Sequence, residues 1–307
     1  MDVSIVVPVY KSSASLSELV SRVTTHMDAM DRSWELILVD DGSPDDSAKK
    51  IESLCANNPQ VTGLLLARNS GQHYATLCGI KHSSGEFVLT VDDDLQNPPD
   101  QFEKLMKPIE GGYHIAIGVP DQKEHGWFRR LSSSMMQRLV SLILGKPKDL
   151  KLSSFRCFSR KAADLISGYE GSFPYMPALM FESIPFRKIT NVSFRHDKRI
   201  AGKSSYSLRK LVKLASFLLI NHSMILLRMA VVVGVILAVA SVVLSLYLLV
   251  MYFLYQSSVQ GWTSIVILIS FFSGMILITL GILGEYIGRI VKLSDDVPRY
   301  QIYKKIN

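Results

Sequence analysis

Short apolar runs, each followed by a polar loop and a helix-like stretch, recur along the first part of the chain. The first run, "VSIVVPV", ends at a polar "KSSAS", and a helix-like segment follows over 14–30. "WELILVDDGSPDDSAKK", "VTGLLLARNSGQHYATLCGIKHSSG" and "EFVLTVDDDLQNPPDQFEKLM" repeat this plan. Four strand–loop–helix units spaced by about 25 to 30 residues predict an α/β fold with a mostly parallel sheet and helices on both faces.

Polar and acidic residues follow the apolar strand in all four units. They are Tyr10, then Asp40 and Asp41, then Asn69 and Gln72, then Asp92, Asp93 and Asp94. Ligands of such sheets bind where the strands end, so we expect the four loops to converge on one crevice. The sequence has neither a GxGxxG after the first strand nor a Walker pattern, which argues against a Rossmann-type dinucleotide site or a P-loop.

Residues 113–200 are less regular. They contain a strand-like "YHIAIGV", a basic helical "GWFRRLSSSMMQRLVSLI" and an aromatic, proline-rich "GSFPYMPALMF". We interpret this region as one that closes over the substrate rather than as part of the framework.

Two long uncharged runs, Met229 to Tyr255 and Trp262 to Gly284, dominate the later part of the chain. Each exceeds the roughly 20 residues that cross a bilayer as a helix, and we predict transmembrane helices over 224–255 and 262–288. The alternative is a pair of buried helices in a soluble core, but such helices rarely lack charge on every face over this length.

The segments flanking these runs are rich in Lys and Arg, whereas the connection "QSSVQGW" has none. The positive-inside bias then puts both flanks in the cytoplasm: a domain over 1–200, and a basic tail over 289–307. The stretch from Lys203 to Phe217 has the pattern of a basic amphipathic helix, so we expect a juxtamembrane interfacial helix over 201–223, with a solvated linker helix as the alternative. The start "MDVSIVVPVYK" lacks the features of a signal peptide.

The net charge of +7, in a chain that is 48% hydrophobic, is partly explained by these basic flanks, which favour contact with anionic membrane lipids. We expect no nucleic-acid partner, because no nucleic-acid motif accompanies the basic residues. Cys55, Cys78 and Cys157 are widely spaced and match no metal or redox pattern.

The three adjacent aspartates in "VDDDLQNPP" have three ordinary explanations: a divalent cation, a basic partner, or capping of the following helix. Mg²⁺ and Mn²⁺ prefer hard oxygen ligands, and Mg²⁺ commonly takes one or two carboxylates together with substrate phosphates. Capping needs one Asp rather than three. The cluster therefore favours a metal.

Seven fragments, from "VSIVVPVYK" through "ILVDDGSPDDS", "ARNSGQHYATLCGI", "SGEFVLTVDDDLQNPP", "GWFRRL" and "GKSSYSLRKL" to "LGEYIGRI", together carry a family resemblance. In this order they resemble the polyisoprenyl-phosphate glycosyltransferases of the inverting family-2 nucleotide-sugar transferases. That family includes bactoprenol glucosyltransferases, undecaprenyl-phosphate formamido-arabinose transferase and dolichol-phosphate mannose synthase. The match runs nearly end to end.

The resemblance implies a Rossmann-like GT-A fold, Mg²⁺ or Mn²⁺ as cofactor, and a set of site residues. Asp92 and Asp94 are expected at the metal-bound diphosphate. The expected nucleotide-sugar contacts are Pro8, Tyr10, Val39, Asp41, Asn69, Gln72, Asp92, Asp93 and Gln96. The cations expected at the acceptor phosphate are Arg129, Arg199 and Lys203.

The chain also departs from this family. Relatives often read "VYNE" where this chain has Lys11 and Ser12, and a frequent arginine falls on Pro120. Many carry "DxGDFR", with the proposed catalytic aspartate, where this chain reads "KLSSFR"; Asp149 is the nearest substitute for a base.

A phosphate acceptor makes a base unnecessary, because its second pKa of about 6 leaves it largely ionised in the cytosol. We therefore expect positioning by cations such as Lys151 to replace proton abstraction, with Asp94, Lys151 and Asp149 as the candidate catalytic residues.

The leading hypothesis is an enzyme of the bacterial inner membrane that transfers one sugar from a nucleotide diphosphate, with UDP preferred over GDP, to undecaprenyl phosphate at the cytoplasmic face. The product would be a lipid-linked sugar for cell-envelope glycan modification. The alternatives are a transferase that extends a polysaccharide or glycolipid, although its usual "QxxRW" element is missing, and a non-catalytic membrane scaffold. The family also makes a homotetramer plausible.

Overall fold

The protein is described by a computed structural model that covers residues 1–121, 147, 149–169, 174–194 and 300–307, with isolated positions between 232 and 290. By its internal contacts the chain divides into two units, Met1–Leu211 with Val297–Asn307, and Val212–Asp296. The first unit contains every strand described below.

One sheet of eight strands organises the first unit, in the order β7-β5-β6-β4-β1-β2-β3-β8. The strands are β1 (Val3–Val9), β2 (Trp34–Asp40), β3 (Val61–Leu66), β4 (Phe87–Thr90), β5 (Ile115–Pro120), β6 (Arg156–Ser159), β7 (Ile189–Phe194) and β8 (Ile302–Ile306). Strands β1 to β4 are mutually parallel, whereas β6 runs antiparallel between β4 and β5. The four repeated units thus form the predicted parallel core.

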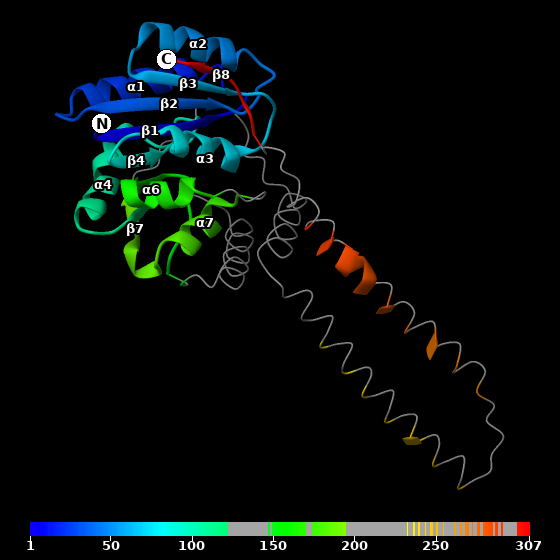
Figure 1. The fold of residues 1–307 in the computed structure, drawn as a ribbon. Helices are drawn as coiled ribbons and strands as arrows, with labels where there is room; N and C mark the ends of the chain where they lie inside the picture. The colour runs from blue at the N-terminus through cyan, green and yellow to red at the C-terminus, as the bar shows by residue number, and fades with distance from the viewer. Residues whose placement is uncertain are drawn as a thin grey trace. The chain divides into compact units, whose positions relative to one another are not determined.

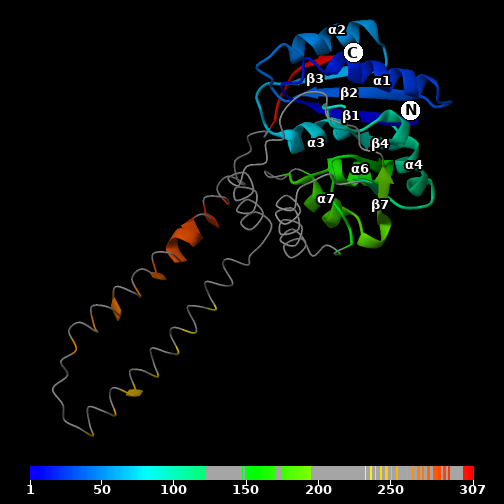
Figure 2. The same cartoon turned by 180° about the vertical axis from the view of Figure 1, so that it is seen from behind.

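Helices lie on both sides of this sheet (Figures 1 and 2). They are α1 (Leu16–Asp28), α2 (Ser47–Asn57), α3 (Gln72–His82), η1 (Pro99–Gln101), α4 (Phe102–Glu110), α6 (Arg160–Ser167), α7 (Met176–Ser183) and η2 (Phe186–Lys188). Buried residues of α1, α2 and α4 pack with one face of the strands, and those of α3, α6 and α7 pack with the other. Because both faces are covered, β1 is buried along its whole length.

The described part of region 113–200 differs from the expectation drawn from the sequence. We interpreted it as closing over the substrate rather than as framework, but β5, β6 and β7 belong to the same sheet as β1 to β4. The interpretation was wrong because β6 is short and pairs with β4, which lies far earlier in the chain, and such pairing leaves little local signal.

Strand β8 completes the sheet at the outer edge of β3 and runs antiparallel to it. The Ala67 N–H donates to the Gln301 carbonyl at 2.8 Å, and Lys304 pairs with Glu52 at 2.9 Å. This strand falls within 289–307, for which the sequence predicted only a basic tail. Pairing with β8 covers backbone groups of β3 that would otherwise form an open edge.

The second unit is described only at scattered positions between 232 and 290, nearly all of which are helical. Within the described residues, no helix has the length and apolar character that a membrane crossing requires. The helix predicted over 201–223 lies outside the described residues, as do most residues of the two predicted crossings. These segments stay predictions.

Candidate active site

The candidate site lies at the carboxyl ends of β1, β2 and β4, where the polar loops predicted from the sequence come together. The parallel register aligns Val9 of β1 with Asp40 of β2, and Val6 of β1 with Thr90 of β4. The loops that follow these strands therefore leave the sheet on the same side.

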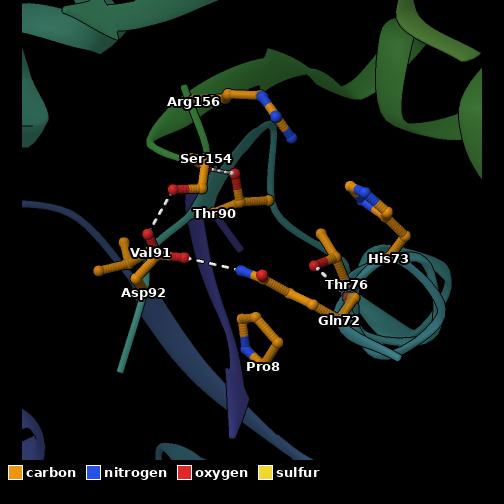
Figure 3. A pocket seen from close by; sticks show the side chains of 9 residues that line it. All are labelled: Pro8, Gln72, His73, Thr76, Thr90, Val91, Asp92, Ser154 and Arg156. Carbon is orange, nitrogen blue, oxygen red and sulfur yellow. Dashed lines mark hydrogen bonds between the residues drawn. The ribbon is translucent and has the colours of Figure 1, made fainter. Parts of the chain in front are cut away.

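A small pocket of about 50 Å³ lies in this region, between the end of β4 and the start of α3 (Figure 3). Its walls come from four parts of the chain: the end of β1, the start of α3, β4 with the residues after it, and the start of β6. The lining residues are Pro8, Gln72, His73, Thr76, Thr90, Val91, Asp92, Ser154 and Arg156.

Asp92 is held by two side chains in this pocket. Gln72 Nε2 donates to Asp92 Oδ1 at 2.9 Å, and the Ser154 hydroxyl donates to Asp92 Oδ2. Thr90 positions Ser154, because the Thr90 hydroxyl donates to the Ser154 carbonyl at 2.7 Å. Burial raises the pKa of Asp92, and the neighbouring carboxylates add to the effect while the Ser154 bond opposes it.

Asp93 faces a different set of groups, in the loop after β1. Its Oδ2 accepts hydrogen bonds from the Tyr10 N–H at 3.2 Å and from the Ser12 hydroxyl. Its carbonyl accepts a third bond from the Ser15 hydroxyl at 2.8 Å. Between the first two donors lies Lys11, with φ at +58°, in the left-handed region that residues other than glycine rarely adopt. The Asp93 carboxylate thus bonds both sides of a strained turn.

Asp41 joins the loop after β2 to the start of α3. Its two carboxylate oxygens accept from the Ser70 and Gly71 N–H groups at 2.7 and 2.8 Å. Burial raises the pKa of Asp41 despite these bonds. Gly42 lets the two loops approach, because a Cβ there would lie 2.6 Å from the backbone of Arg68.

Asp94 begins the turn that leads from β4 to η1. Its Oδ1 accepts from the Gln96 N–H at 3.2 Å, and the residue between them, Leu95, has φ at +62°. Strained backbone of this kind concentrates at functional sites. Gln96, the residue predicted near the diphosphate, therefore holds Asp94 through its backbone.

Arg156 is the buried cation of the pocket, with only 6% of its surface exposed. Its Nε has no hydrogen-bond partner among the residues that the structure describes. Burial lowers the pKa of Arg156 to about 10, and the Asp92 carboxylate partly offsets that shift, so the guanidinium stays charged at neutral pH.

His73 lies beside Arg156 in the pocket wall, and its ring meets Tyr175 edge-on at 5.2 Å between centroids. Burial and the charge of Arg156 lower the pKa of His73 to about 4. The imidazole is therefore neutral at physiological pH, and Arg156 is the cation that this wall contributes.

The other residues predicted from the sequence have more varied positions. Tyr10 is 42% exposed and Asn69 is exposed, whereas Val39 is fully buried in the core, so a ligand could reach Val39 only through its backbone. Lys151 and Asp149 are exposed, and the Lys151 backbone pairs with the Asn191 side chain of β7 at 2.8 and 2.9 Å. Arg129, Arg199 and Lys203 lie outside the described residues.

Four residues of the pocket were not predicted from the sequence: Arg156, His73, Thr76 and Thr90. One signal was present: Arg156 is a lone charge within the apolar run "FRCF", where a buried strand normally has none. Ser154, the second serine of "KLSSFR", falls where many family members carry the proposed catalytic aspartate, and its bond to Asp92 depends on the pairing of β4 with β6.

A divalent cation fits the acidic end of this site. In the described part of the chain no three His, Cys, Asp or Glu side chains are grouped to hold a metal by themselves. Asp92 and Asp94 nevertheless offer hard oxygen ligands within one short turn, and the repulsion between them adds to burial in raising the pKa of Asp92. A cation shared between these carboxylates and a phosphate would remove that repulsion.

The chain matches the model of one protein family, described as Glycosyl transferase family 2. The match covers residues 4–169, which is more than half of the chain.

Solved structures of glucosyl-3-phosphoglycerate synthase from Mycobacterium tuberculosis are similar in fold. Its complex with Mn²⁺, UDP and phosphoglyceric acid is 18% identical, with a TM-score of 0.52, over 70% of this chain and 75% of that one. The complex with Mn²⁺, UDP and glucosyl-3-phosphoglycerate is 18% identical, with a TM-score of 0.53, over 72% and 79%. At such identity the similarity shows the fold, which is GT-A-like.

Proposed function

Since this chain belongs to glycosyl transferase family 2, we propose that it transfers a single sugar from a UDP-sugar to polyprenyl phosphate, with inversion and with the help of Mn²⁺ or Mg²⁺. The observation that carries this proposal is the meeting of two acidic loops: Asp41 beside the start of α3, and Asp92 to Asp94 after β4. The similarly folded synthase binds UDP and Mn²⁺, which supports a UDP donor and a metal here.

The reaction needs little proton transfer from the protein. An oxygen of the acceptor phosphate attacks the anomeric carbon from the face opposite the leaving group, the new C–O bond forms as the old one breaks, and UDP leaves with the bonding electron pair. The acceptor is already an anion near neutral pH, so positioning is the main task. A bound dication would stabilise the charge that develops on the leaving diphosphate.

Residues of this chain have defined tasks in that scheme. Tyr10 and the loop held by Asp93 bind the nucleoside, and Asp92 and Asp94 face the metal and the diphosphate. Lys151 contributes an exposed positive charge near the acceptor. We further propose that Arg129, Arg199 and Lys203 meet the lipid phosphate at the cytoplasmic face of the inner membrane, as their family positions imply.

A transfer assay with an acceptor pair tests the proposal. The full-length protein in detergent is given Mn²⁺ or Mg²⁺, a panel of labelled nucleotide-sugars, and either undecaprenyl phosphate or 3-phosphoglycerate. We expect a lipid-soluble product with undecaprenyl phosphate only. Product with 3-phosphoglycerate alone would contradict polyprenyl phosphate as the acceptor. No product from any donor with either acceptor would favour the non-catalytic scaffold.

A further inference from the structure

Two arginines four residues apart, one at the start of β6 and one at the start of α6, differ in their bonding. Arg160, at the start of α6, donates from Nη1 to the carbonyls of Ser83 and Gly85 at 2.9 and 3.3 Å, and it pairs with Asp164 at 2.8 Å. Arg156, four residues earlier, is more buried, and within the described residues no hydrogen bond satisfies its Nε. Figure 3 shows its guanidinium at the wall of the pocket, on the side of His73.

A buried guanidinium without an anion is unfavourable, because charged groups are costly to remove from water unless they are paired. The Asp92 carboxylate favours the charged form of Arg156, and its two oxygens accept from Gln72 and Ser154. The described residues form no ion pair between Arg156 and Asp92. Within the described part of the chain, the pocket therefore contains a positive charge that is incompletely satisfied.

Binding of a dication would increase this imbalance. A metal at Asp92 and Asp94 would use the charge of the one carboxylate that partly compensates Arg156. The first turn of α3 also faces the pocket through Gln72 and His73, and a helix N-terminus favours negative charge. With a metal bound at Asp92 and Asp94, the site would therefore require an additional anion on the Arg156 side of Asp92.

The size of the pocket suits a small anionic group. About 50 Å³ has room for groups the size of phosphate oxygens. The planar fork of donors on a guanidinium matches two oxygens of one phosphate.

We propose that the pocket lined by Arg156 is a phosphate-oxyanion site in which Arg156 donates directly to phosphate oxygens. The inference rests on the proposed function, because both of its substrates carry phosphate: the donor as a diphosphate and the acceptor as a monoester. A phosphate from either substrate would supply the negative charge that Arg156 requires.

The test compares Arg156→Met and Arg156→Lys with the matched control Arg160→Met in the full-length protein in detergent. Two affinities are measured by calorimetry without turnover: that of UDP in the presence of Mn²⁺, and that of inorganic phosphate for protein saturated with Mn²⁺ and UDP. The melting temperature of the ligand-free protein is recorded for each variant.

We expect Arg156→Met to weaken one of these affinities by about tenfold or more while the melting temperature stays equal to the wild type or rises. Loss of UDP affinity assigns the pocket to the donor diphosphate, and loss of phosphate affinity with UDP binding intact assigns it to the acceptor phosphate. Arg156→Lys should recover part of the loss. Arg160→Met should lower the melting temperature and leave both affinities unchanged.

The proposal is overturned if Arg156→Met lowers the melting temperature as Arg160→Met does and changes neither affinity. Both affinities are measured without sugar transfer. A failure of the transfer assay would therefore contradict the proposed function without deciding whether Arg156 binds phosphate.

Discussion

The two sides of the candidate site are built in opposite ways. On the side that we propose binds the nucleoside (the nucleoside side), Asp93 accepts hydrogen bonds that join the loop after β4 to the loop after β1, and Asp41 accepts bonds that join the loop after β2 to the loop after β3. On the pocket side, Arg156 has an unsatisfied Nε among the described residues, and Asp92 and Asp94 repel each other. The nucleoside side is organised before any ligand arrives, whereas the pocket side needs ligands to balance its charges.

The strongest test of the pocket side is Asp94→Ala, which removes a carboxylate that the metal is expected to use. We expect metal-dependent transfer to fall by about 10²-fold or more, because charge on the leaving diphosphate would lose its stabilisation. Titration of Mn²⁺ against initial rate measures the effect. If the Mn²⁺ dependence of the rate is unchanged in this variant, Asp94 does not bind the metal.

Asp93→Ala tests the nucleoside side. The substitution removes the acceptor for Tyr10 N–H and the Ser12 hydroxyl, so the strained turn at Lys11 can relax. Two lost bonds predict a rise of about tenfold in the KM for the donor, with a smaller change in kcat.

Asp93→Asn, which keeps a carbonyl acceptor, should restore much of the donor affinity. Asp45→Ala is the matched control, because it removes a carboxylate that bonds Ser13 and Ser47 and makes no direct hydrogen bond to residues 10–12. If Asp45→Ala and Asp93→Ala raise KM equally, the effect belongs to the loop as a whole rather than to Asp93.

His73→Gln should change the pH dependence of stability. The pKa of His73 is lowered from 6.5 to about 4 in the folded protein, so between these values the unfolded chain binds the proton more tightly. Stability is therefore lost as the pH falls from about 6.5 toward 4, and the variant should lose about 2 kcal/mol less by pH 5. Urea unfolding at pH 7 and pH 5 measures the difference, and equal losses in both proteins would show that His73 is not held neutral.

Lys151→Ala is expected to have the smallest effect, because this side chain is exposed and screened by water. We expect a fall of about threefold in kcat/KM for the lipid acceptor. Asp149→Ala should leave turnover intact. Full turnover in Lys151→Ala would contradict a cationic role for Lys151. If Asp149→Ala loses turnover but still binds its substrates, Asp149 is a catalytic base.

The sequence predicted the parts of the site that depend on local pattern. Each strand followed by a polar loop was recognisable, and this was enough to place Asp41, Gln72 and Asp92 at the same edge of the sheet. The parts that were not predicted depend on pairing between distant segments. Ser154 reaches Asp92 only because β6 inserts antiparallel beside β4.

The same limit applies to Asp93 and to Arg156. Asp93 was expected as a nucleotide-sugar contact, but its bonds to Tyr10 and Ser12 were not predicted, since they join residues more than eighty positions apart. The lone arginine in an apolar run was visible in the sequence, but only the structure shows that its Nε has no hydrogen-bond partner among the described residues.

Strand β8 sets an order for biosynthesis. The ribosome produces β3 early, and the strand that pairs with its outer edge emerges only after residues 212–296 have been made. Until then the nascent sheet has an edge that could recruit a strand from another chain. A stop codon before Ile302 would leave that edge open in every molecule, so truncation there is expected to yield aggregation even though residues of the pocket remain in the chain.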